Sequence, residues 1–414
     1  MLKIFDTSHY QKLEIPHNWQ WTTLEELVVL ISGQDFSPEK YNSDRNGIPY
    51  IIGASNIRNN QVEITRWTEY PSVISEKDDL LIVCKGAGIG KMGINQVGTS
   101  HIARQIQAIR PFSDYINLEF LQLVLMKGIE QIVSQANGLI PGLPRDLLLK
   151  FPIPLPPLSE QNKIVQKTIS TLRIVNLIEE NSKVLERIIS SMKSKILELA
   201  MQGKLVPQDP ADEPAADMLR RINPKAKIIT DNPHYPKLPD NWVLTTIGDI
   251  FKINPKNKVS DDTTAAFIPM NAIHDGFSDS FSYEERDWKD IKSGFTHFAN
   301  GDVAVAKISP CLENRKSMIL RNLPNGIGAG TTELLVFRSE ILLPEFSLLF
   351  FKSDIFINSC TGTFNGVVGQ QRVGKNIVEE IAIPIPPIST QKKIINIVKQ
   401  WFILLDKIQV SLLN

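Results

Sequence analysis

The sequence is poor in the residues that build metal sites and disulfide frameworks. Its 414 residues include three cysteines and six histidines. Cys84, Cys311 and Cys360 stand far apart without a CxxC pair, and no two histidines stand four residues apart. Zinc sites and thiol redox motifs require such close spacings. We therefore expect no metal site and no disulfide.

The chain also lacks a net charge and a long apolar run. It carries 45 basic and 45 acidic residues, so the basic footprint of a typical nucleic-acid-binding domain is absent. Any DNA contact must come from local clusters, or from partner subunits that bring positive charge. No apolar run approaches the length of a membrane span, and the start, MLKIFDTSHY, has no signal-peptide pattern. We expect a cytoplasmic protein.

What the sequence does contain is a repeat of domain length. Asn18-Trp19, followed by two threonines, recurs as Asn241-Trp242, again followed by two threonines. The run FPIPLPPLSEQNKIV at 151–165 recurs as IAIPIPPISTQKKII at 381–395. Repeats this long are whole domains, so the chain is one module duplicated.

Each copy enters a helix after its proline-rich run. Residues 160–202 contain no proline or glycine and carry apolar residues three and four apart, which predicts one helix of about 65 Å at 1.5 Å per residue. Residues 389–414 repeat the pattern over a shorter length, so the two helices are expected to pair as a coiled coil. Ser159 and Ser389 are the expected N-caps.

The remaining elements are shorter. Interspersed strands and helices predict a mixed α+β fold in each copy. Strands are expected at 48–52, 80–84, 267–270 and 303–306, and helices at 118–126, 214–222 and 345–352. The proline-rich runs are expected to be edge strands or extended arms that lead into the helices, and not PxxP peptide ligands.

The sequence offers no convincing catalytic motif. KGAGIGKMG at 85–93 contains a literal GxGxxG, but no helix follows it, and we expect a loop at a strand end. The tetrapeptide NPHY at 232–235 lacks the second proline of the NPPY motif of adenine methyltransferases. One Asp-x-Lys at 287–289 does not make a nuclease site, and the scattered histidines support no triad. We expect no catalysis by this chain.

Polar residues at strand-end loops are the candidates for DNA contact. Arg side chains can read guanine, Asn and Gln side chains can read adenine, and Lys side chains can bind phosphates. For any single residue, the simpler interpretation is an ordinary exposed side chain without a role in DNA binding. The predicted DNA-binding residues are Asn56, Arg58, Lys85, Lys91, Arg104, Gln105, Gln107, Asn271, Lys307, Ser309, Asn314, Arg315, Lys316, Gln370, Gln371 and Arg372.

The repeated PLPPLSEQ and PIPPISTQ junctions, with ILELAMQGKLVPQDPADEPA at 196–215, resemble the specificity subunit of a Type I restriction-modification system. The resemblance covers essentially the whole chain. It implies an α+β fold with two target recognition domains, joined by two long antiparallel coiled-coil helices with pseudo-two-fold symmetry. The implied division is target recognition domain 1 at 1–158, a central spacer helix at 159–205, a linker at 206–237, target recognition domain 2 at 238–388 and a shorter distal spacer helix at 389–414.

The same resemblance implies a non-catalytic subunit that reads a bipartite, asymmetric target in double-stranded DNA. Two methylation subunits would dock on the helices and bring S-adenosylmethionine, and restriction subunits would bring ATP and magnesium, so this chain needs no cofactor or metal. The alternatives are a two-domain coiled-coil adaptor for proteins or peptides, the specificity polypeptide of a related Type II (IIB-like) enzyme, and a self-sufficient methyltransferase or nuclease. The short final helix departs from the family pattern and leaves full-length pairing open.

Overall fold

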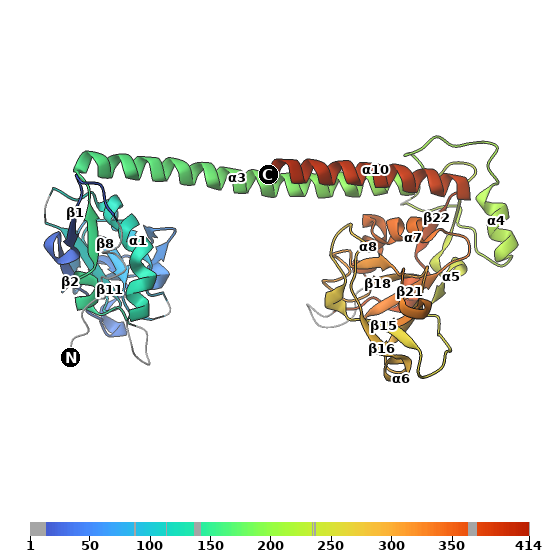
Figure 1. Ribbon diagram of the computed structural model, residues 1–414, viewed down its shortest axis with the longest axis horizontal. Coiled ribbons are helices and arrows are strands. Elements are labelled where there is room, and N and C mark those ends of the chain that lie inside the picture. Colours follow the sequence, from blue (N-terminus) through green and yellow to red (C-terminus); the bar gives the residue numbers. More distant parts are fainter. Residues whose placement is uncertain are drawn as a thin grey trace. The chain divides into compact units, whose positions relative to one another are not determined.

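A computed structural model describes residues 14–86, 88–112, 114–135, 142–233, 235, 237–362 and 371–413; the side chains of residues 130–135, 412 and 413 are not part of that description. The chain divides into two compact units, residues 1–178 and 179–414. Each unit is described by itself. Figure 1 labels their elements.

Unit 1 contains two sheets and a two-stranded ribbon. The first sheet has the order β6-β3-β10-β7 and the second the order β2-β11-β8-β9-β5-β4. The strands of the sheets are β2 (Val28–Ser32), β3 (Ile48–Ile51), β4 (Ile57–Arg58), β5 (Gln61–Val62), β6 (Trp67–Thr68), β7 (Ile74–Ser75), β8 (Leu80–Val83), β9 (Met92–Ile94), β10 (Ser100–Ile102) and β11 (Ile106–Pro111). Helices α1 (Leu118–Gln135) and α2 (Arg145–Leu149) follow. Strand β8 is fully buried because apolar clusters lie on both of its faces.

Unit 2 repeats this topology, except that its second sheet, in the residues described, lacks counterparts of β5 and β4. Its sheets have the orders β16-β15-β20-β17 and β14-β21-β18-β19. Their strands are β14 (Lys252–Ile253), β15 (Thr264–Ile268), β16 (Glu284–Asp287), β17 (Thr296–Ala299), β18 (Val303–Ala306), β19 (Ser317–Ile319), β20 (Ile327–Gly330) and β21 (Leu334–Arg338). The helices before the final one are α4 (Ala215–Ile222), α5 (Ile247–Ile250), α6 (Trp288–Ile291), α7 (Pro344–Phe351), α8 (Asp354–Thr361) and α9 (Lys375–Glu379). The predicted duplication of a mixed α/β module is confirmed.

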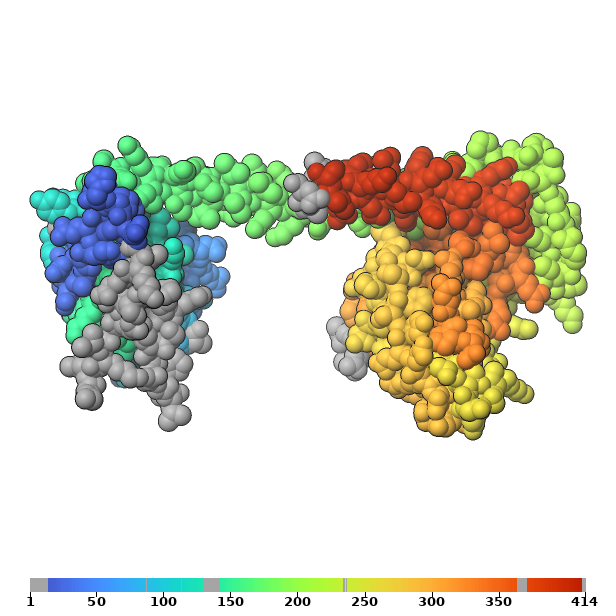
Figure 2. All heavy atoms as spheres, viewed as in Figure 1, coloured from blue at the N-terminus to red at the C-terminus, as the bar shows by residue number. Residues whose placement is uncertain are grey.

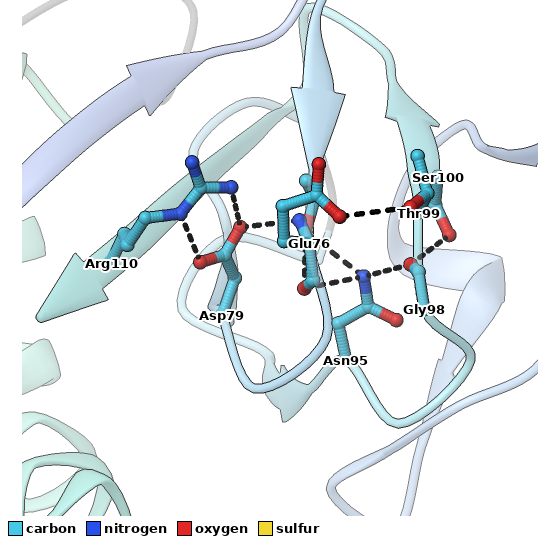
Figure 3. Close-up of polar contacts among 8 residues, drawn as sticks. Glu76, Asp79, Asn95, Gly98, Thr99, Ser100 and Arg110 are labelled. Carbon is cyan, nitrogen blue, oxygen red and sulfur yellow. Dashed lines mark hydrogen bonds and ion pairs between the residues drawn. The ribbon is translucent and has the colours of Figure 1, made fainter.

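An ion pair between a buried aspartate and a partly exposed arginine occurs in both copies, as Asp79–Arg110 and Asp302–Arg338. In unit 1, Asp79 accepts two hydrogen bonds from Arg110, at 2.8 and 2.7 Å, and a third from the backbone N–H of Glu76 at 2.7 Å (Figure 3). Asn95 and Thr99 extend this network across the neighbouring turns, because the Asn95 amide donates to the Glu76 and Gly98 carbonyls and Thr99 to the Glu76 carboxylate. The pair therefore ties strands β8 and β11 to the loops beside them.

The proline-rich runs form strands that pair with the start of each copy. β1 (Gln20–Thr23) pairs antiparallel with β12 (Pro152–Leu155), and β13 (Val243–Thr246) pairs in the same way with β22 (Ala382–Ile385). Each ribbon has two strands, so every strand in it has a free edge where proline loses no ladder bond. The prediction of edge strands is confirmed.

Two helices follow these ribbons: α3 (Leu158–Met201) and α10 (Ile388–Leu413). The helix predicted at 160–202 agrees with α3 within two residues, whereas the spacer helix implied at 159–205 ends four residues too late; the helix predicted at 389–414 agrees with α10 within one residue. The N-cap prediction is wrong, because both helices begin one residue before the serines. Ser159 and Ser389 therefore lie inside the first turn, and the Ser389 hydroxyl is buried without a partner.

Buried glutamines fasten both helices to their units. Gln391 accepts a hydrogen bond from the backbone N–H of Leu343 at 2.9 Å and donates to the carbonyls of Ile341 and Pro386. Gln161 makes the same three kinds of bond at the start of α3. This is the physical reason for the glutamine that both junction motifs share.

We expect Gln391→Ala to lower the free energy of unfolding by about 2–3 kcal/mol, because it leaves buried backbone groups without partners. Urea denaturation followed by far-UV circular dichroism measures the change. The matched control is Gln400→Ala on the exposed face of the same helix, with an expected change of about 0.5 kcal/mol or less. Equal losses in the two variants would contradict the role of Gln391.

Within unit 2, α10 packs antiparallel along the second half of α3 (Figure 1). Ile189 and Leu197 of α3 share an apolar cluster with Val398 and Leu405 of α10. The Lys193 ammonium bonds to the Asp406 carboxylate at 2.5 Å and sets the register of the two helices. The predicted antiparallel pair is confirmed over this length.

Candidate nucleic-acid interface

In unit 2, polar residues gather at the sheet edge where β18 ends and where β19 and β21 begin. Lys307 follows β18, Lys316 precedes β19 and Glu333 precedes β21. The Lys307 N–H donates to the Glu333 carbonyl at 2.9 Å, and the Val373 N–H donates to the Lys307 carbonyl at 3.0 Å. These backbone bonds bring the 371–373 segment to the same edge.

Arg372 and Glu333 form a bidentate ion pair at this edge. The Arg372 Nε and Nη2 groups donate to the two Glu333 carboxylate oxygens at 2.8 and 2.9 Å. The hydrogen bond from Arg372 holds the pKa of Glu333 below its ordinary value. The pair therefore fixes the plane of the Arg372 guanidinium and holds its Nε–Nη2 edge against Glu333.

The corresponding edge of unit 1 has the same construction. Lys85 follows β8, Lys91 precedes β9 and Gln105 precedes β11. The Cys84 N–H donates to the Gln105 carbonyl at 2.7 Å, and the Leu143 N–H donates to the Cys84 carbonyl at 2.8 Å. Lys85, Lys91 and Gln105 are exposed. Residues 88–90 of the glycine-rich segment form a turn after a strand, as predicted.

The tight hairpin of β4 and β5 lines a pocket at this edge. β4 and β5 are joined by Asn59 and Asn60, whose φ angles of 49° and 62° match a type I′ turn. Arg58, the two asparagines and Lys91 line a pocket of about 440 Å³. The structure thus brings the predicted residues Arg58 and Lys91 together, although they are far apart in the sequence.

Two further predicted residues of unit 1 flank the β10–β11 turn. Arg104 is exposed and pairs with Asp35, with 3.0 Å between Arg104 Nε and an Asp35 carboxylate oxygen. Gln107 lies on β11, where its side-chain oxygen is buried without a partner. Arg104 therefore lies on the surface of the edge, whereas Gln107 lies within the sheet.

Asn56, Lys316 and Arg315 make contacts that hold their own loops in place. The Asn56 side chain is buried and bonds the backbone of Ile52, Gly53 and Glu63. The Lys316 ammonium donates to the Ile273 carbonyl at 2.9 Å. Arg315 lies over the Phe277 ring and bonds Ser194 on α3 and Asp354. Their contacts organise loops or attach unit 2 to α3, and DNA contact by them stays a prediction.

Beneath Arg315 lies a buried lysine that the sequence reasoning missed. Lys352 donates to the Gly276 and Arg315 carbonyls, both at 2.8 Å. Burial lowers the pKa of Lys352 to about 7. Because its bonds go to backbone carbonyls, Lys352 supports the loop that carries Arg315.

The remaining candidates are distributed around the unit 2 edge. Asn271 and Asn314 are exposed. Ser309 donates to Glu313 at 2.6 Å, and the Ser309 N–H donates to the Gln371 carbonyl at 2.8 Å. Gln370 lies outside the described residues. Sequence reasoning also missed Asn59, Asn60 and Glu333. Two adjacent asparagines are typical of a turn, so the sequence could have predicted the first two. No local sequence pattern indicates that Glu333 pairs with Arg372.

No metal-binding cluster of His, Cys, Asp or Glu occurs in the part of the chain that the structure describes. Cys84, Cys311 and Cys360, all of them described, form no disulfide. Asp287 and Lys289, the half-motif of a nuclease, pair with each other on the surface at 2.9 Å. Among the described helices, none is both long and apolar enough to cross a membrane.

A mixed α/β module that occurs twice, each time followed by a long helix, defines a protein of two similar domains. The family described as "Type I restriction modification DNA specificity domain" matches the chain twice, at residues 16–187 and 239–412. The chain belongs to this family.

Similar proteins carry the same description. The Type I restriction enzyme EcoAI specificity subunit of Escherichia coli is 44% identical over 240 residues, covering 53% of this chain and 41% of that protein. The EcoEI specificity subunit of the same species is 38% identical over 241 residues, with 53% and 40% covered. The chain thus matches less than half the length of these two relatives. The EcoDI specificity subunit is 22% identical over 97% of this chain and 85% of its own length.

Solved structures share the fold. A structure titled "Structural basis underlying complex assembly and conformational transition of the type I R-M system" aligns with a TM-score of 0.62 at 16% identity, over 97% of this chain and 94% of the other. The HsdS subunit from Thermoanaerobacter tengcongensis aligns with a TM-score of 0.55 at 16% identity, over 97% and 92%. At these identities the likeness concerns the fold alone.

Proposed function

We propose that this chain is the DNA-sequence specificity subunit of a Type I restriction-modification complex. The observation that carries the proposal is the repeated sheet edge, with Lys85, Lys91 and Gln105 in one copy and Lys307, Glu333 and Arg372 in the other. Each edge would read one half of a bipartite target, because exposed Arg and Gln side chains can contact base edges while lysines hold phosphates. The two edges carry different residues, which favours an asymmetric target.

In this proposal the chain itself catalyses nothing and binds no cofactor or metal. Methylation subunits supply S-adenosylmethionine and adenine methylation, and restriction subunits supply ATP-driven cleavage with magnesium. The helices provide their docking surface and act as the spacer between the half-sites. The complex works in the cytoplasm, where the DNA is. Neutral net charge fits a reader that shares its phosphate contacts with its partners.

The test is a footprint of the chain assembled with its methylation subunits on DNA of its target sequence, which the methylated adenines of a host genome would reveal. We expect two protected half-sites separated by an unprotected gap. A single protected site, or binding that does not weaken as salt rises, would contradict the proposal and favour a protein-binding adaptor.

An insertion in α3 tests the spacer role. Four residues inserted after Ser182 lengthen the helix by about 6 Å and keep its apolar stripe roughly in register. We expect a longer gap in the recognised target, read from the new methylation pattern. A matched substitution, Ser182→Ala, should leave the target unchanged. An unchanged target in an insertion variant of normal activity would contradict the spacer role.

A further inference from the structure

A groove of about 820 Å³ lies in unit 2 between α7, α10 and the 273–281 loop, which a bridge between Ile273 and Phe281 closes. This volume is in the range of pockets that hold small molecules. The lining residues of α7 and α10 mostly stand three or four apart, so each helix contributes one face. Figure 2 shows the red atoms of α10 lying against the yellow and orange atoms that precede α10 in unit 2.

The floor of the groove is apolar. Ile319, Leu348 and Val398 line it and are buried. Phe277 and Phe402 also line it, and their ring centroids lie 5.4 Å apart in an edge-to-face contact. None of these side chains can donate or accept a conventional hydrogen bond. A ligand that fits the floor must therefore have an apolar body.

The acidic side chains that line the groove are paired with cations. Asp279 and Glu345 both pair with Arg321. Asp406, the other acidic residue of the lining, pairs with Lys193. The described lining thus presents no unpaired carboxylate that would repel an anion.

The lysines of the lining have no acidic partner among the residues described. Lys392 and Lys399 stand seven residues apart on α10, and both are exposed. Lys352, directly after α7, is 1% exposed. Its ammonium donates to the carbonyls of Gly276 and Arg315, both at 2.8 Å. An ammonium has three N–H groups, so one of them has no partner in the part of the chain that the structure describes.

The charge of Lys352 is poorly compensated in this place. Burial lowers the pKa of Lys352 to about 7, although the carboxylates of Asp279 and Asp275 favour the charged form. Those carboxylates pair with other cations, Asp275 with Lys316 and Asp279 with Arg321, each at 3.6 Å. An anion in the groove would therefore stabilise the ammonium of Lys352.

We infer that this groove binds a small amphipathic anion. The apolar body of the ligand covers the floor, and its carboxylate, sulfonate or phosphate head accepts a hydrogen bond from Lys352. Lys392 and Lys399 raise the local concentration of such anions at the rim. The groove lies within unit 2 and its ligand is a small molecule, so DNA recognition is not required.

The probes are 1-anilinonaphthalene-8-sulfonate and N-phenyl-1-naphthylamine, which share an apolar ring system and differ in the sulfonate. Titrated into the full chain and followed by fluorescence, the sulfonate probe should bind saturably, with one molecule per chain. Lys352→Met keeps an apolar stem and should weaken the sulfonate probe about tenfold or more, but the neutral probe less than about twofold. Lys407→Met removes an exposed charge of α10 outside the groove and should change either affinity less than about twofold.

A second variant tests the groove without removing a charge. Leu349→Trp fills the groove from a partly exposed position of α7 and should weaken both probes about tenfold or more. Leu404→Trp, on the exposed side of α10, should change both affinities less than about twofold. The sulfonate probe should also raise the melting temperature of the unchanged chain, because it binds the folded state.

Four outcomes would overturn the inference. These are no saturable binding of the sulfonate probe, equal effects of Lys352→Met and Lys407→Met, equal weakening of both probes by Lys352→Met, and full binding by a folded Leu349→Trp variant.

Discussion

We expect Asp302→Ala to lower the free energy of unfolding of unit 2 by about 2–3 kcal/mol, because it removes a buried carboxylate that accepts three hydrogen bonds, whereas its partner Arg338 is partly exposed to solvent. Asp302 is 1% exposed. Its two carboxylate oxygens accept from Arg338 at 2.6 and 2.8 Å, and one of them also accepts from the Ala299 N–H at 2.7 Å. The substitution therefore removes three bonds between β18, β21 and the preceding turn.

Urea denaturation monitored by tryptophan fluorescence measures this loss. The control is Asp261→Ala, which breaks the exposed pair with Lys292 and should cost about 1 kcal/mol or less. Asp79→Ala in unit 1 should behave like Asp302→Ala, since it removes the same three bonds shown in Figure 3. A loss at Asp302 no larger than at Asp261 would contradict the role assigned to the buried carboxylate.

The second large effect is expected at the unit 2 edge. Lys307→Ala combined with Arg372→Ala should weaken DNA binding by the assembled complex about a hundredfold, because two contacts that each contribute about tenfold are lost. The slope of log affinity against log salt should fall by about two. Affinity titrations at several salt concentrations measure both quantities.

The matched control removes two charges at the other sheet of unit 2, which contains β15 and β16. Lys292→Ala with Arg286→Ala should leave the affinity within about threefold, because Lys292 pairs with Asp261 near the start of β15 and Arg286 lies on β16 opposite Ala265. Glu333→Gln retains the charge of Arg372 but weakens the contact that holds its guanidinium in one orientation. It should therefore reduce the discrimination between target and non-target DNA more than it reduces the affinity for DNA. Equal effects of the two double variants would contradict the edge as the DNA-contacting surface.

Local patterns predicted the scaffold well. The proline-free run at 160–202 could only be a long helix, and the prolines before it could only lie on a strand with a free edge. The serine caps were predicted wrongly because a serine before an apolar run is a statistical signal, whereas the helix start is held by the buried Gln161 and Gln391. Their bonds to residues about fifty positions away leave no local pattern.

The candidate site was predicted less completely. The sequence placed the candidates near strand ends, but residue type alone could not separate exposed Arg372 from Arg315, whose guanidinium lies on Phe277 and Ser194. Asn56 looked like an adenine reader, and its buried amide instead holds a turn. These differences depend on burial and on partners that lie far away in the chain.

The sequence by itself determined the duplication, the mixed α/β class of each copy, the extended runs and the two helices, because these depend on periodicity and on residues with few backbone options. Only the tertiary structure decided which polar residues share a sheet edge, which are used internally, and which helix faces are covered. Whether a helix face is covered depends on contacts with other segments of the chain. Leu405 and Val175 stand at matching positions after the buried glutamine of their helix, yet Leu405 is buried by a neighbouring segment, whereas no described segment buries Val175.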